Sequence, residues 1–361
     1  MILLDFHQFL LRAFARFREP IFFEGFVAPR HTPKKFLNYL LANLEYRMGR
    51  LRPISRPYQA VINPTDVCNL SCPLCPARNS AKGGRKRSMM RLEDFKKTVD
   101  ELGDCLYSVF LYNWGEPFLS PKTFEMIKYA KSKGISTFIS SNMSVRISGL
   151  GGKIVGSGLD YLYVSIDGND AATYSKYRRG GDYSLVMSNL GEVLKARKAL
   201  KSKTPFVVAG YLAMRHNEGG VERFKKEMLE MGVDRVYVGR ALVVDYVKEK
   251  GWLPLNEEYN GYSADGKRKT PFSRCSLPWT SVVIHPNLAV SICCAGLGLF
   301  DEGYDLGSLR GRPFPEVWNS NQYSELRRII RDKVAGTGSQ CSKCIAGDHP
   351  FDIAVGWAQN R

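Results

Sequence analysis

Hydrophobic and polar positions follow two alternating periods between residues 58 and 241. Six short runs rich in β-branched and aromatic residues predict strands, at residues 59–67, 107–113, 136–142, 161–167, 206–214 and 235–241. Between them, apolar residues recur at helical spacing, for example at Leu92, Phe95, Val99 and Leu102, and at Val221, Phe224, Met228 and Leu229. Strands that alternate with helices indicate a parallel sheet with right-handed crossovers. We therefore expect an α/β fold, a partial (β/α)6 barrel of TIM type.

The two flanks of this region do not follow the alternation. Residues 1–57 are typical of two helical pieces separated by "APRHTP", whereas residues 256–361 are irregular, Gly-rich and contain five cysteines. A small segment of this kind is more readily stabilised by metal than by a large core. The sequence thus predicts a basic amphipathic helical extension (1–57), the barrel (58–255) and a small C-terminal cluster-binding domain (256–361).

The charge of the chain indicates an anionic partner. The 361 residues carry a formal net charge of +17 and the pI is about 9.5, which suits nucleic acid, lipid headgroups or a phosphorylated substrate. The sequence contains no RNA-binding module, no interleaving of basic and aromatic residues and no zinc-finger histidines. We therefore expect no nucleic-acid partner.

The first 18 residues leave two interpretations open. One helical face combines apolar residues with basic neighbours; these are Leu3, Phe6, Leu10, Ala13, Phe14 and Phe17, beside Arg12, Arg16 and Arg18. Such a helix either lies on an anionic membrane or packs against the bottom of the barrel. The N-terminus lacks the features of a secretory signal, and no apolar run has the length of a membrane span. We predict a cytoplasmic protein, with attachment to a membrane surface left open.

Three cysteines lie in the loop that follows the first predicted strand. Cys68, Cys72 and Cys75 have the spacing C-x3-C-x2-C within "DVCNLSCPLC", and loops at the carboxyl ends of parallel strands carry the site in folds of this kind. A disulfide would leave one thiol over, and a zinc ion would need a fourth ligand from elsewhere. Three thiolates on a 4Fe-4S cluster would leave one iron open.

At this loop the sequence resembles the radical S-adenosylmethionine (SAM) superfamily. The resemblance implies that the open iron binds the amino and carboxylate groups of SAM. It also implies reductive cleavage to a 5′-deoxyadenosyl radical, which abstracts hydrogen from the substrate. Leu74 stands where the family usually has an aromatic residue.

Further motifs at successive strand ends extend the resemblance. "NWGEP" resembles the glycine-glutamate motif of the family, with Trp114 in place of the first glycine, and "SSN", "SID" and "YSKYRRG" match its ribose and carboxylate contacts. The resemblance implies seven cofactor-binding residues: Gly115, Glu116, Ser141, Asn142, Ser165, Asp167 and Arg178. Glu116 would receive the ammonium of SAM. Taken singly, each motif is also typical of a turn, a helix cap or a solvated charge.

A second set of cysteines lies near the C-terminus. Cys275, Cys293, Cys341 and Cys344 offer four thiolates, which suit a structural zinc or a fully ligated 4Fe-4S cluster. The set resembles the auxiliary-cluster domains called SPASM and twitch, and the single-cluster twitch form is the better match. Leu288 stands where this family has glycine. Cys294 beside Cys293 leaves the choice of ligand open.

These resemblances imply an oxidoreductase with two 4Fe-4S clusters and SAM. The auxiliary cluster would accept the electron left after hydrogen abstraction, and an electron donor such as flavodoxin or ferredoxin would supply the reductant. We expect a small hydroxylated substrate, sugar-like or lipid-linked. The alternatives are a peptide or protein maturase of the SPASM type and, in a different class, a metal-stabilised binding protein without catalysis. The sequence identifies no catalytic residue.

Overall fold

The computed structural model describes residues 22–23, 26–27, 32–75, 88–243, 245–267, 269, 275–293, 306–337, 341–342 and 345. The predictions for residues 1–18, Cys294 and Cys344 lie outside these residues.

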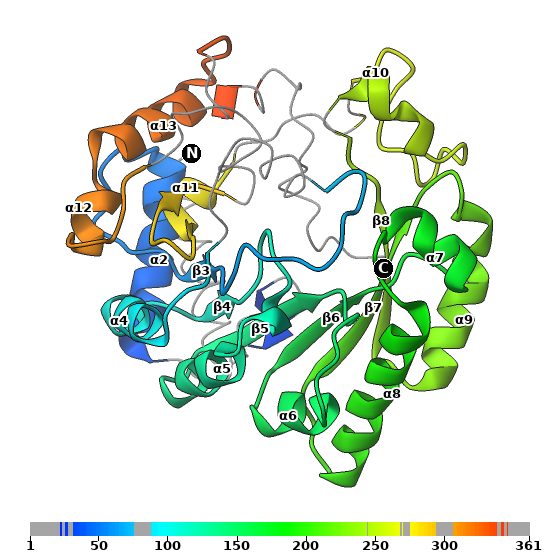
Figure 1. Ribbon diagram of the computed structural model, residues 1–361. Coiled ribbons are helices and arrows are strands. Elements are labelled where there is room, and N and C mark those ends of the chain that lie inside the picture. The colour runs from blue at the N-terminus through cyan, green and yellow to red at the C-terminus, as the bar shows by residue number, and fades with distance from the viewer. Residues whose placement is uncertain are drawn as a thin grey trace.

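An eight-stranded, mostly parallel sheet organises the described chain (Figure 1). Its order is β10-β9-β3-β4-β5-β6-β7-β8. The six predicted strands are confirmed as β3 (Gln59–Ile62), β4 (Ser108–Phe110), β5 (Ser136–Ser141), β6 (Tyr161–Ser165), β7 (Phe206–Ala213) and β8 (Arg235–Arg240). All six are parallel to their neighbours, and the sheet curves into an unclosed partial barrel.

Two further strands extend this sheet from the C-terminal part of the chain. Strand β9 (Ser281–Ile284) pairs in parallel with all four residues of β3, and β10 (Val290–Ser291) pairs antiparallel with β9. The expectation of an irregular C-terminal segment was wrong here, because "SVVI" is an apolar run that the sheet buries. A separate hairpin is formed by β1 (Phe22–Phe23) and β2 (Phe26–Val27).

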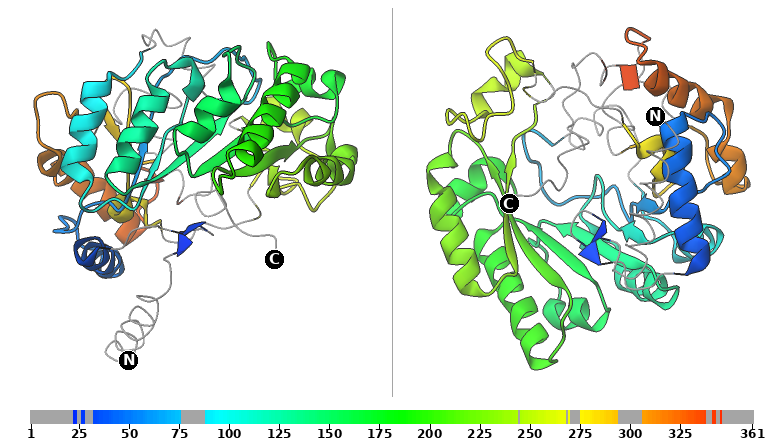
Figure 2. Two further views of the ribbon diagram at one scale, coloured as in Figure 1. Left: turned by 90° about the horizontal axis from the view of Figure 1, so that it is seen from below. Right: turned by 180° about the vertical axis from the view of Figure 1, so that it is seen from behind.

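Helices cover the convex face of the sheet (Figures 1 and 2). They are α4 (Leu92–Leu102), α5 (Thr123–Ser132), α6 (Leu150–Gly156), α7 (Ala171–Tyr177), α8 (Tyr183–Ala199) and α9 (Val221–Met231). The predicted apolar face of α4 is buried, as are three of the four positions predicted for α9. Leu229 is the exception at 54% exposed, because α9 turns this position away from the sheet.

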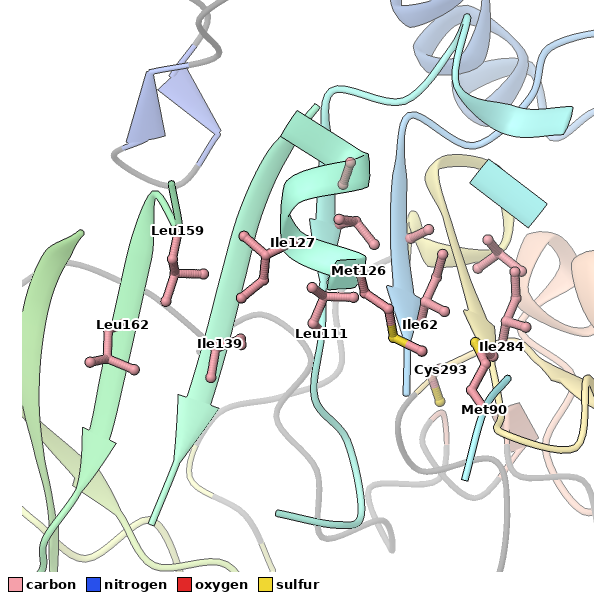
Figure 3. Close-up of a cluster of buried hydrophobic side chains, with 14 of the residues drawn as sticks. Ile62, Met90, Leu111, Met126, Ile127, Ile139, Leu159, Leu162, Ile284 and Cys293 are labelled. Carbon is pink, nitrogen blue, oxygen red and sulfur yellow. The ribbon is translucent and has the colours of Figure 1, made fainter. Parts of the chain in front are cut away.

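The main hydrophobic core lies between the sheet and these helices. Figure 3 shows Ile62, Leu111 and Ile139 of the sheet region beside Met126 and Ile127 of α5, all fully buried. Burial of such side chains stabilises the fold by about 1.5–3 kcal/mol each relative to exposure. This core fixes where the strands end, and therefore where the loops that follow them lie.

The concave face of the sheet carries a row of aromatic rings. Phe110, Phe138, Tyr161 and Phe206 are partners in register on four adjacent strands. Their successive ring centroids are 4.8, 5.5 and 5.7 Å apart, within the range of favourable aromatic contacts. Aromatic side chains thus line the inside of the partial barrel.

A second group of helices packs beside β9. Helix α2 (Pro33–Met48) contacts the short helix α11 (Leu277–Thr280), which contacts α13 (Asn321–Asp332). The indole of Trp279 donates to the Arg50 carbonyl (2.7 Å), and that of Trp318, in α12 (Phe314–Trp318), donates to the Ser55 carbonyl (3.0 Å). The segments before and after the barrel therefore pack on each other. None of the helices in the described ranges combines the length and apolarity that a membrane crossing needs.

Four short elements follow strands of the barrel. The 3-10 helix η2 (Pro117–Leu119) follows β4, η3 (Glu218–Gly220) follows β7, and α10 (Tyr246–Glu249) and η4 (Lys250–Trp252) follow β8.

Candidate functional site

The three barrel cysteines lie in the loop after β3, as predicted. Cys72 belongs to a small apolar cluster with Leu74, Tyr177 and Met214, and Cys75 packs against the same cluster. Leu74, which replaces the usual aromatic residue, is 8% exposed and fills this cluster. The loop is thus held by its own apolar side chains.

The electrostatic surroundings of these thiols fit a bound metal centre. Burial, together with smaller effects of Glu116, Cys75 and Cys72, raises the pKa of the Cys68 thiol to about 11, although the hydrogen bond from the Leu70 amide opposes it. Burial likewise raises the pKa of Cys72, although Arg178 opposes this effect. Buried thiols such as Cys68 and Cys72, which resist ionisation, need a cationic group to become thiolates, and a metal centre provides one.

Three thiols in one loop suit an iron-sulfur cluster, in which each thiolate binds a different iron. Cys68, Cys72 and Cys75 would hold such a cluster.

Two of the predicted cofactor residues point at the sulfur atoms. The Asn142 side-chain amide lies 3.8 Å from Cys68 Sγ, and Arg178 Nη1 lies 3.9 Å from Cys72 Sγ. Hydrogen bonds to ligand sulfurs help to set the reduction potential of an iron-sulfur cluster. Asn142 and Arg178 are therefore placed to act on the cluster ligands, a role that the sequence did not indicate.

Glu116 joins the loops that follow β4 and β5. Its carboxylate accepts hydrogen bonds from the Ser141 hydroxyl (2.7 Å), the Asn142 amide (2.7 Å) and the Phe118 amide (3.2 Å). Burial raises the pKa of Glu116 to about 7, against the effect of these hydrogen bonds. The predicted contact between Glu116 and the ammonium of SAM stays a prediction, because the chain itself supplies donors to both carboxylate oxygens.

Gly115 is required by the packing of two loops. A Cβ atom at this position would lie 2.0 Å from the Thr65 carbonyl oxygen and 2.8 Å from that of Val67. The Glu116 amide donates to the same Val67 carbonyl (2.8 Å). The glycine therefore lets the loop after β4 press against the cysteine loop; close approach to SAM remains a prediction.

Asp167 and Arg178 pair with each other. Arg178 Nη2 lies 2.5 Å from Asp167 Oδ2. The Asp167 side chain is 1% exposed and that of Arg178 is 15% exposed. The other carboxylate oxygen accepts the Leu212 amide (2.6 Å). Burial works to lower the pKa of Arg178, but Asp167 and Cys72 hold it well above its ordinary value. The pair links the loop after β6 to the cysteine loop, and the predicted carboxylate contact of SAM is untested.

The backbone is strained at this edge of the sheet. Met143 and Asp167 have φ angles of 53° and 63°, which non-glycine residues seldom adopt and which cluster at functional sites. Ser165 ends β6 opposite Gly210, but within the described chain its side chain makes no hydrogen bond to the other predicted residues. Ser165 therefore lies at the same edge of the sheet as Asp167, and its predicted contact with the cofactor stays a prediction.

Sequence reasoning missed several supporting amides. Asn69 accepts from the Asn142 side chain (3.0 Å) and donates to the Ser144 carbonyl (2.6 Å). Asn217 donates to the Asp167 carbonyl (2.9 Å). The Asn113 side-chain nitrogen, after β4, is buried with no partner in the described chain, so a donor remains for a ligand at this edge. The position of Asn69 between two cysteines was the only signal in the sequence.

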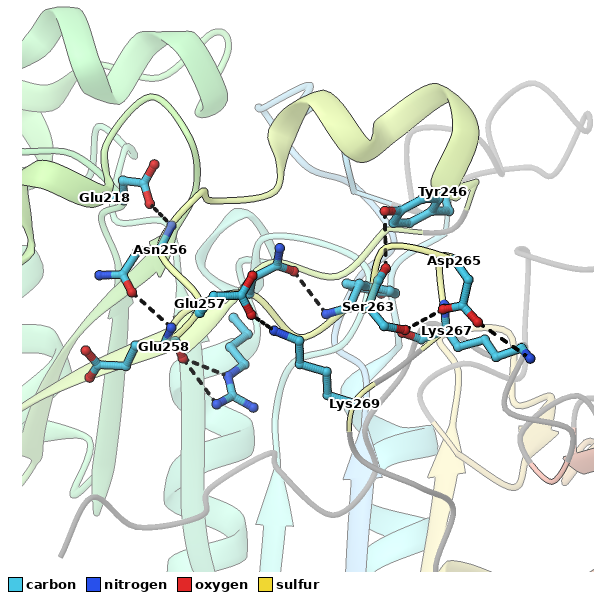
Figure 4. Close-up of polar contacts among 12 residues, drawn as sticks. Glu218, Tyr246, Asn256, Glu257, Glu258, Ser263, Asp265, Lys267 and Lys269 are labelled. Carbon is cyan, nitrogen blue, oxygen red and sulfur yellow. Dashed lines mark hydrogen bonds and ion pairs between the residues drawn. The ribbon is translucent and has the colours of Figure 1, made fainter.

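Figure 4 shows the polar contacts that hold the segment after β8. Arg240, at the end of β8, donates to the Glu258 carbonyl (3.2 Å), and the Glu218 carboxylate accepts the Asn256 amide (2.8 Å). Residues of this segment, Val243 and Tyr262, belong to the apolar cluster that contains Cys72. The segment therefore supports the cysteine loop from the side of β8.

Three of the four auxiliary cysteines, Cys275, Cys293 and Cys341, lie within the described residues, near β9, β10 and α13. Cys293 follows β10 and is 5% exposed, Cys341 is 7% exposed, and both thiols interact electrostatically with the Tyr323 phenol. That hydroxyl is buried without a hydrogen-bond partner in the described chain. A buried, unpartnered donor beside two cysteines fits a cluster whose sulfur atoms accept hydrogen bonds. Cys275 is half-buried at the start of α11.

The turn between β9 and β10 explains the unusual Leu288. This residue has a φ of 69° and donates its amide to the His285 carbonyl (2.8 Å). The left-handed conformation is the one that glycine adopts without strain, and the family has glycine here. Leu288 therefore adopts a backbone conformation that favours glycine, while its side chain is 8% exposed in the core.

The fold and the paired cysteine sites define a radical SAM enzyme with an iron-sulfur auxiliary domain. The family model of the radical SAM superfamily matches residues 62–226, and the SPASM model, an iron-sulfur cluster-binding domain, matches residues 275–345. The chain is a member of the radical SAM superfamily with a C-terminal SPASM domain. Its cofactors are 4Fe-4S clusters and SAM.

Relatives and solved structures agree with this assignment. The chain is 24% identical over 315 residues to an AdoMet-dependent heme synthase of Methanosarcina barkeri, covering 78% of this chain and 86% of the relative. It is 21% identical over 310 residues to a tungsten-containing aldehyde ferredoxin oxidoreductase cofactor-modifying protein of Pyrococcus furiosus, covering 77% and 85%. Streptococcus suis SuiB, bound to its precursor peptide SuiA, shares the fold with a TM-score of 0.59 and 13% identity, covering 90% and 78%.

Proposed function

We propose that this protein is a radical SAM oxidoreductase that acts on a small hydroxylated substrate, sugar-like or lipid-linked. When bound, the barrel cluster and SAM supply a 5′-deoxyadenosyl radical that abstracts hydrogen from the substrate. Cys68, Cys72 and Cys75 would hold that cluster, and Asn142 and Arg178 would donate to its ligand sulfurs. An auxiliary 4Fe-4S cluster on Cys275, Cys293, Cys341 and Cys344 would accept the remaining electron, and a flavodoxin or ferredoxin would supply the reductant.

The pairing of β9 with β3 is the observation that carries this proposal. All four residues of β3 are in register with β9, and the Asn63 amide continues the ladder to the Ile284 carbonyl (2.9 Å). The loop with Cys68 follows β3, whereas Cys293 follows the hairpin of β9 and β10. Both cysteine sites are thus built on one sheet, whose rigid core keeps their separation constant. A constant distance between the two cysteine sites suits electron transfer. A structural domain that is loosely attached would not keep this distance constant.

A second candidate is a peptide or protein maturase. It is favoured by the match to the SPASM model and by 26% identity over 161 residues to the mycofactocin maturase MftC of Mycobacterium ulcerans, 44% of this chain and 41% of that relative. This candidate requires a peptide substrate and a surface that binds it.

The experiment measures product and SAM cleavage side by side. Anaerobically reconstituted protein is incubated with SAM, a reductant and panels of nucleotide sugars, lipid-linked sugars, tetrapyrroles and peptides. The proposal expects 5′-deoxyadenosine and an oxidised product from a hydroxylated compound. Turnover of peptides alone would support the maturase instead.

The role of the auxiliary site is tested by substituting two of its cysteines. Cys341→Ala with Cys344→Ala should lose about half of the iron, keep SAM cleavage and lose product formation. If these cysteines hold zinc, the iron content will stay the same, and any loss of activity will follow unfolding of the C-terminal part. Counting iron and zinc in the same samples therefore decides between an electron-accepting cluster and a structural zinc site.

A further inference from the structure

Helix α2 is apolar on the face that points away from the protein. Its inner face packs through Phe36, Tyr39 and Ala42 on the apolar cluster around Tyr58 and Tyr107. The opposite face carries Leu37, Leu41, Leu44 and Met48, whose spacing of four, three and four residues places them in one stripe. We call these four residues the outer stripe of α2.

The two ends of the outer stripe are exposed and its middle is half-buried. Leu37 is 64% and Met48 69% exposed, whereas Leu41 and Leu44 are half-buried and belong to none of the apolar clusters of the described chain. Ile54, in the next segment, is 70% exposed and its amide donates to Glu45 of α2 (2.8 Å). Large apolar side chains that gather on one exposed face mark an interaction site.

Basic residues surround the outer stripe. Lys34 and Arg47 flank it on the helix, and Arg50 and Arg52 follow directly after the helix, all of them exposed. The acidic residue of α2, Glu45, is 1% exposed, accepts the amides of Ile54 and Ser55, and lies 3.4 Å from Arg50 Nη1 in an ion pair. Lys34 pairs with Asp104, and no exposed acidic residue lies within 32–57. Two carboxylates thus stand against four cationic side chains, so the surface is apolar along its centre and carries a net positive charge along its borders.

We propose that the outer stripe of α2 and its basic border bind the surface of an anionic membrane, with α2 lying in the plane of the interface. An amphipathic helix binds there by placing its apolar side chains at the acyl boundary and its cationic side chains among the headgroups. A second copy of this chain fits less well, since pairing two such faces would bring arginines together. The N-terminal residues 1–18 fit less well for the same reason, because they contribute Arg12, Arg16 and Arg18.

The test is sedimentation of the reconstituted protein with vesicles made of phosphatidylcholine and phosphatidylglycerol in equal parts, and with vesicles of phosphatidylcholine alone. The wild type should sediment with the anionic vesicles and less with the neutral ones, and added salt should weaken its binding. Leu37→Ser with Met48→Ser should reduce the partition coefficient by about tenfold or more, because two apolar contacts are lost. Arg47→Gln with Arg52→Gln should reduce binding to the anionic vesicles only.

The control variant is Leu200→Ser with Leu229→Ser. These leucines are 60% and 54% exposed and lie outside α2, so vesicle binding should match that of the wild type. Iron content and SAM cleavage should be unchanged in all the variants, which separates this inference from the proposed chemistry.

Three results would overturn the inference. In the first, the wild type does not bind anionic vesicles. In the second, the Leu37→Ser, Met48→Ser variant binds as well as the wild type, while deletion of residues 1–18 abolishes binding, which would place the anchor in those residues. In the third, analytical ultracentrifugation shows a dimer that this variant dissociates, without any vesicle binding, so that a second copy covers the outer stripe.

Discussion

At the scale of single residues, Glu116 combines complete burial with hydrogen bonds to both of its oxygens. It is 2% exposed, and burial raises its pKa to about 7. A carboxyl group with a raised pKa binds its proton more tightly in the folded than in the unfolded state. The stability that protonated Glu116 contributes to the folded state is therefore fully present below the pKa of this group in the unfolded chain. It is lost as the pH rises through about 7.

We expect Glu116→Gln to remove this pH dependence. Between about pH 4.5 and 7.5 the stability of the wild type should fall relative to the variant by an amount on the order of 3 kcal/mol. Thermal unfolding of both proteins across this range measures the difference. A difference that is constant with pH would show that Glu116 titrates normally.

A second prediction at this scale concerns the buried pair of Arg178 and Asp167. Arg178→Ala leaves the Asp167 carboxylate buried without its cation, and such a loss typically costs about 3–5 kcal/mol. Arg223→Ala removes the exposed partner of Glu227 and should have no measurable effect on stability. Chemical denaturation of both variants checks this, and equal stabilities would mean that the hydrogen bond from the Leu212 amide suffices for Asp167.

At the scale of elements, the loops after β3 and β4 pack against each other through Gly115. A Cβ atom there would overlap the Thr65 carbonyl oxygen at 2.0 Å, and a backbone atom cannot move aside as a flexible side chain can. The two loops must therefore separate if any other residue occupies this position.

Gly115→Ala should destabilise the protein by about 1–3 kcal/mol and lower the iron content of the barrel site. At Gly152, inside α6, an added methyl group would meet no atom within 4 Å, so Gly152→Ala should stabilise the helix by about 0.5–1 kcal/mol. Iron analysis and unfolding midpoints of the pair check the prediction. Equal iron content in both variants would show that the loops tolerate separation.

At the scale of the whole molecule, two cysteine sites share one sheet. The barrel cysteines follow β3, and of the auxiliary cysteines Cys275 precedes β9 and Cys293 follows β10, two strands that extend the same sheet. Most of the hydrophobic core lies on the convex face, under the helices, and does not depend on the cysteine loop. The fold should therefore tolerate loss of the barrel cluster.

Replacing Cys68, Cys72 and Cys75 together by Ala should abolish SAM cleavage and leave about half of the iron, bound at the auxiliary site. Iron counting, 5′-deoxyadenosine analysis and circular dichroism of one preparation check this. Residual cleavage of SAM would show that the open site lies elsewhere, and complete loss of iron would show that the auxiliary cysteines bind none.

Local patterns in the sequence determined a large part of this structure. The six barrel strands, the buried face of α4 and the position of the cysteine loop followed from periodicity and spacing, because burial on one side of an element leaves a repeat in the chain. The family motifs also predicted that Glu116, Ser141, Asn142, Asp167 and Arg178 would gather at the carboxyl edge of the sheet.

Only the tertiary structure decided which groups these side chains meet. Arg178 pairs with Asp167 and approaches Cys72, Glu116 receives its donors from the end of β5, and β9 adds to β3 from a segment more than 200 residues away in the chain. The tertiary structure also decided that Leu37 and Leu229 face outward, since helical spacing alone does not say which side of a helix meets the core. The partners of polar groups and of edge strands come from distant parts of the chain. A periodic pattern indicates that a side chain is buried, but it does not indicate which residue the side chain contacts.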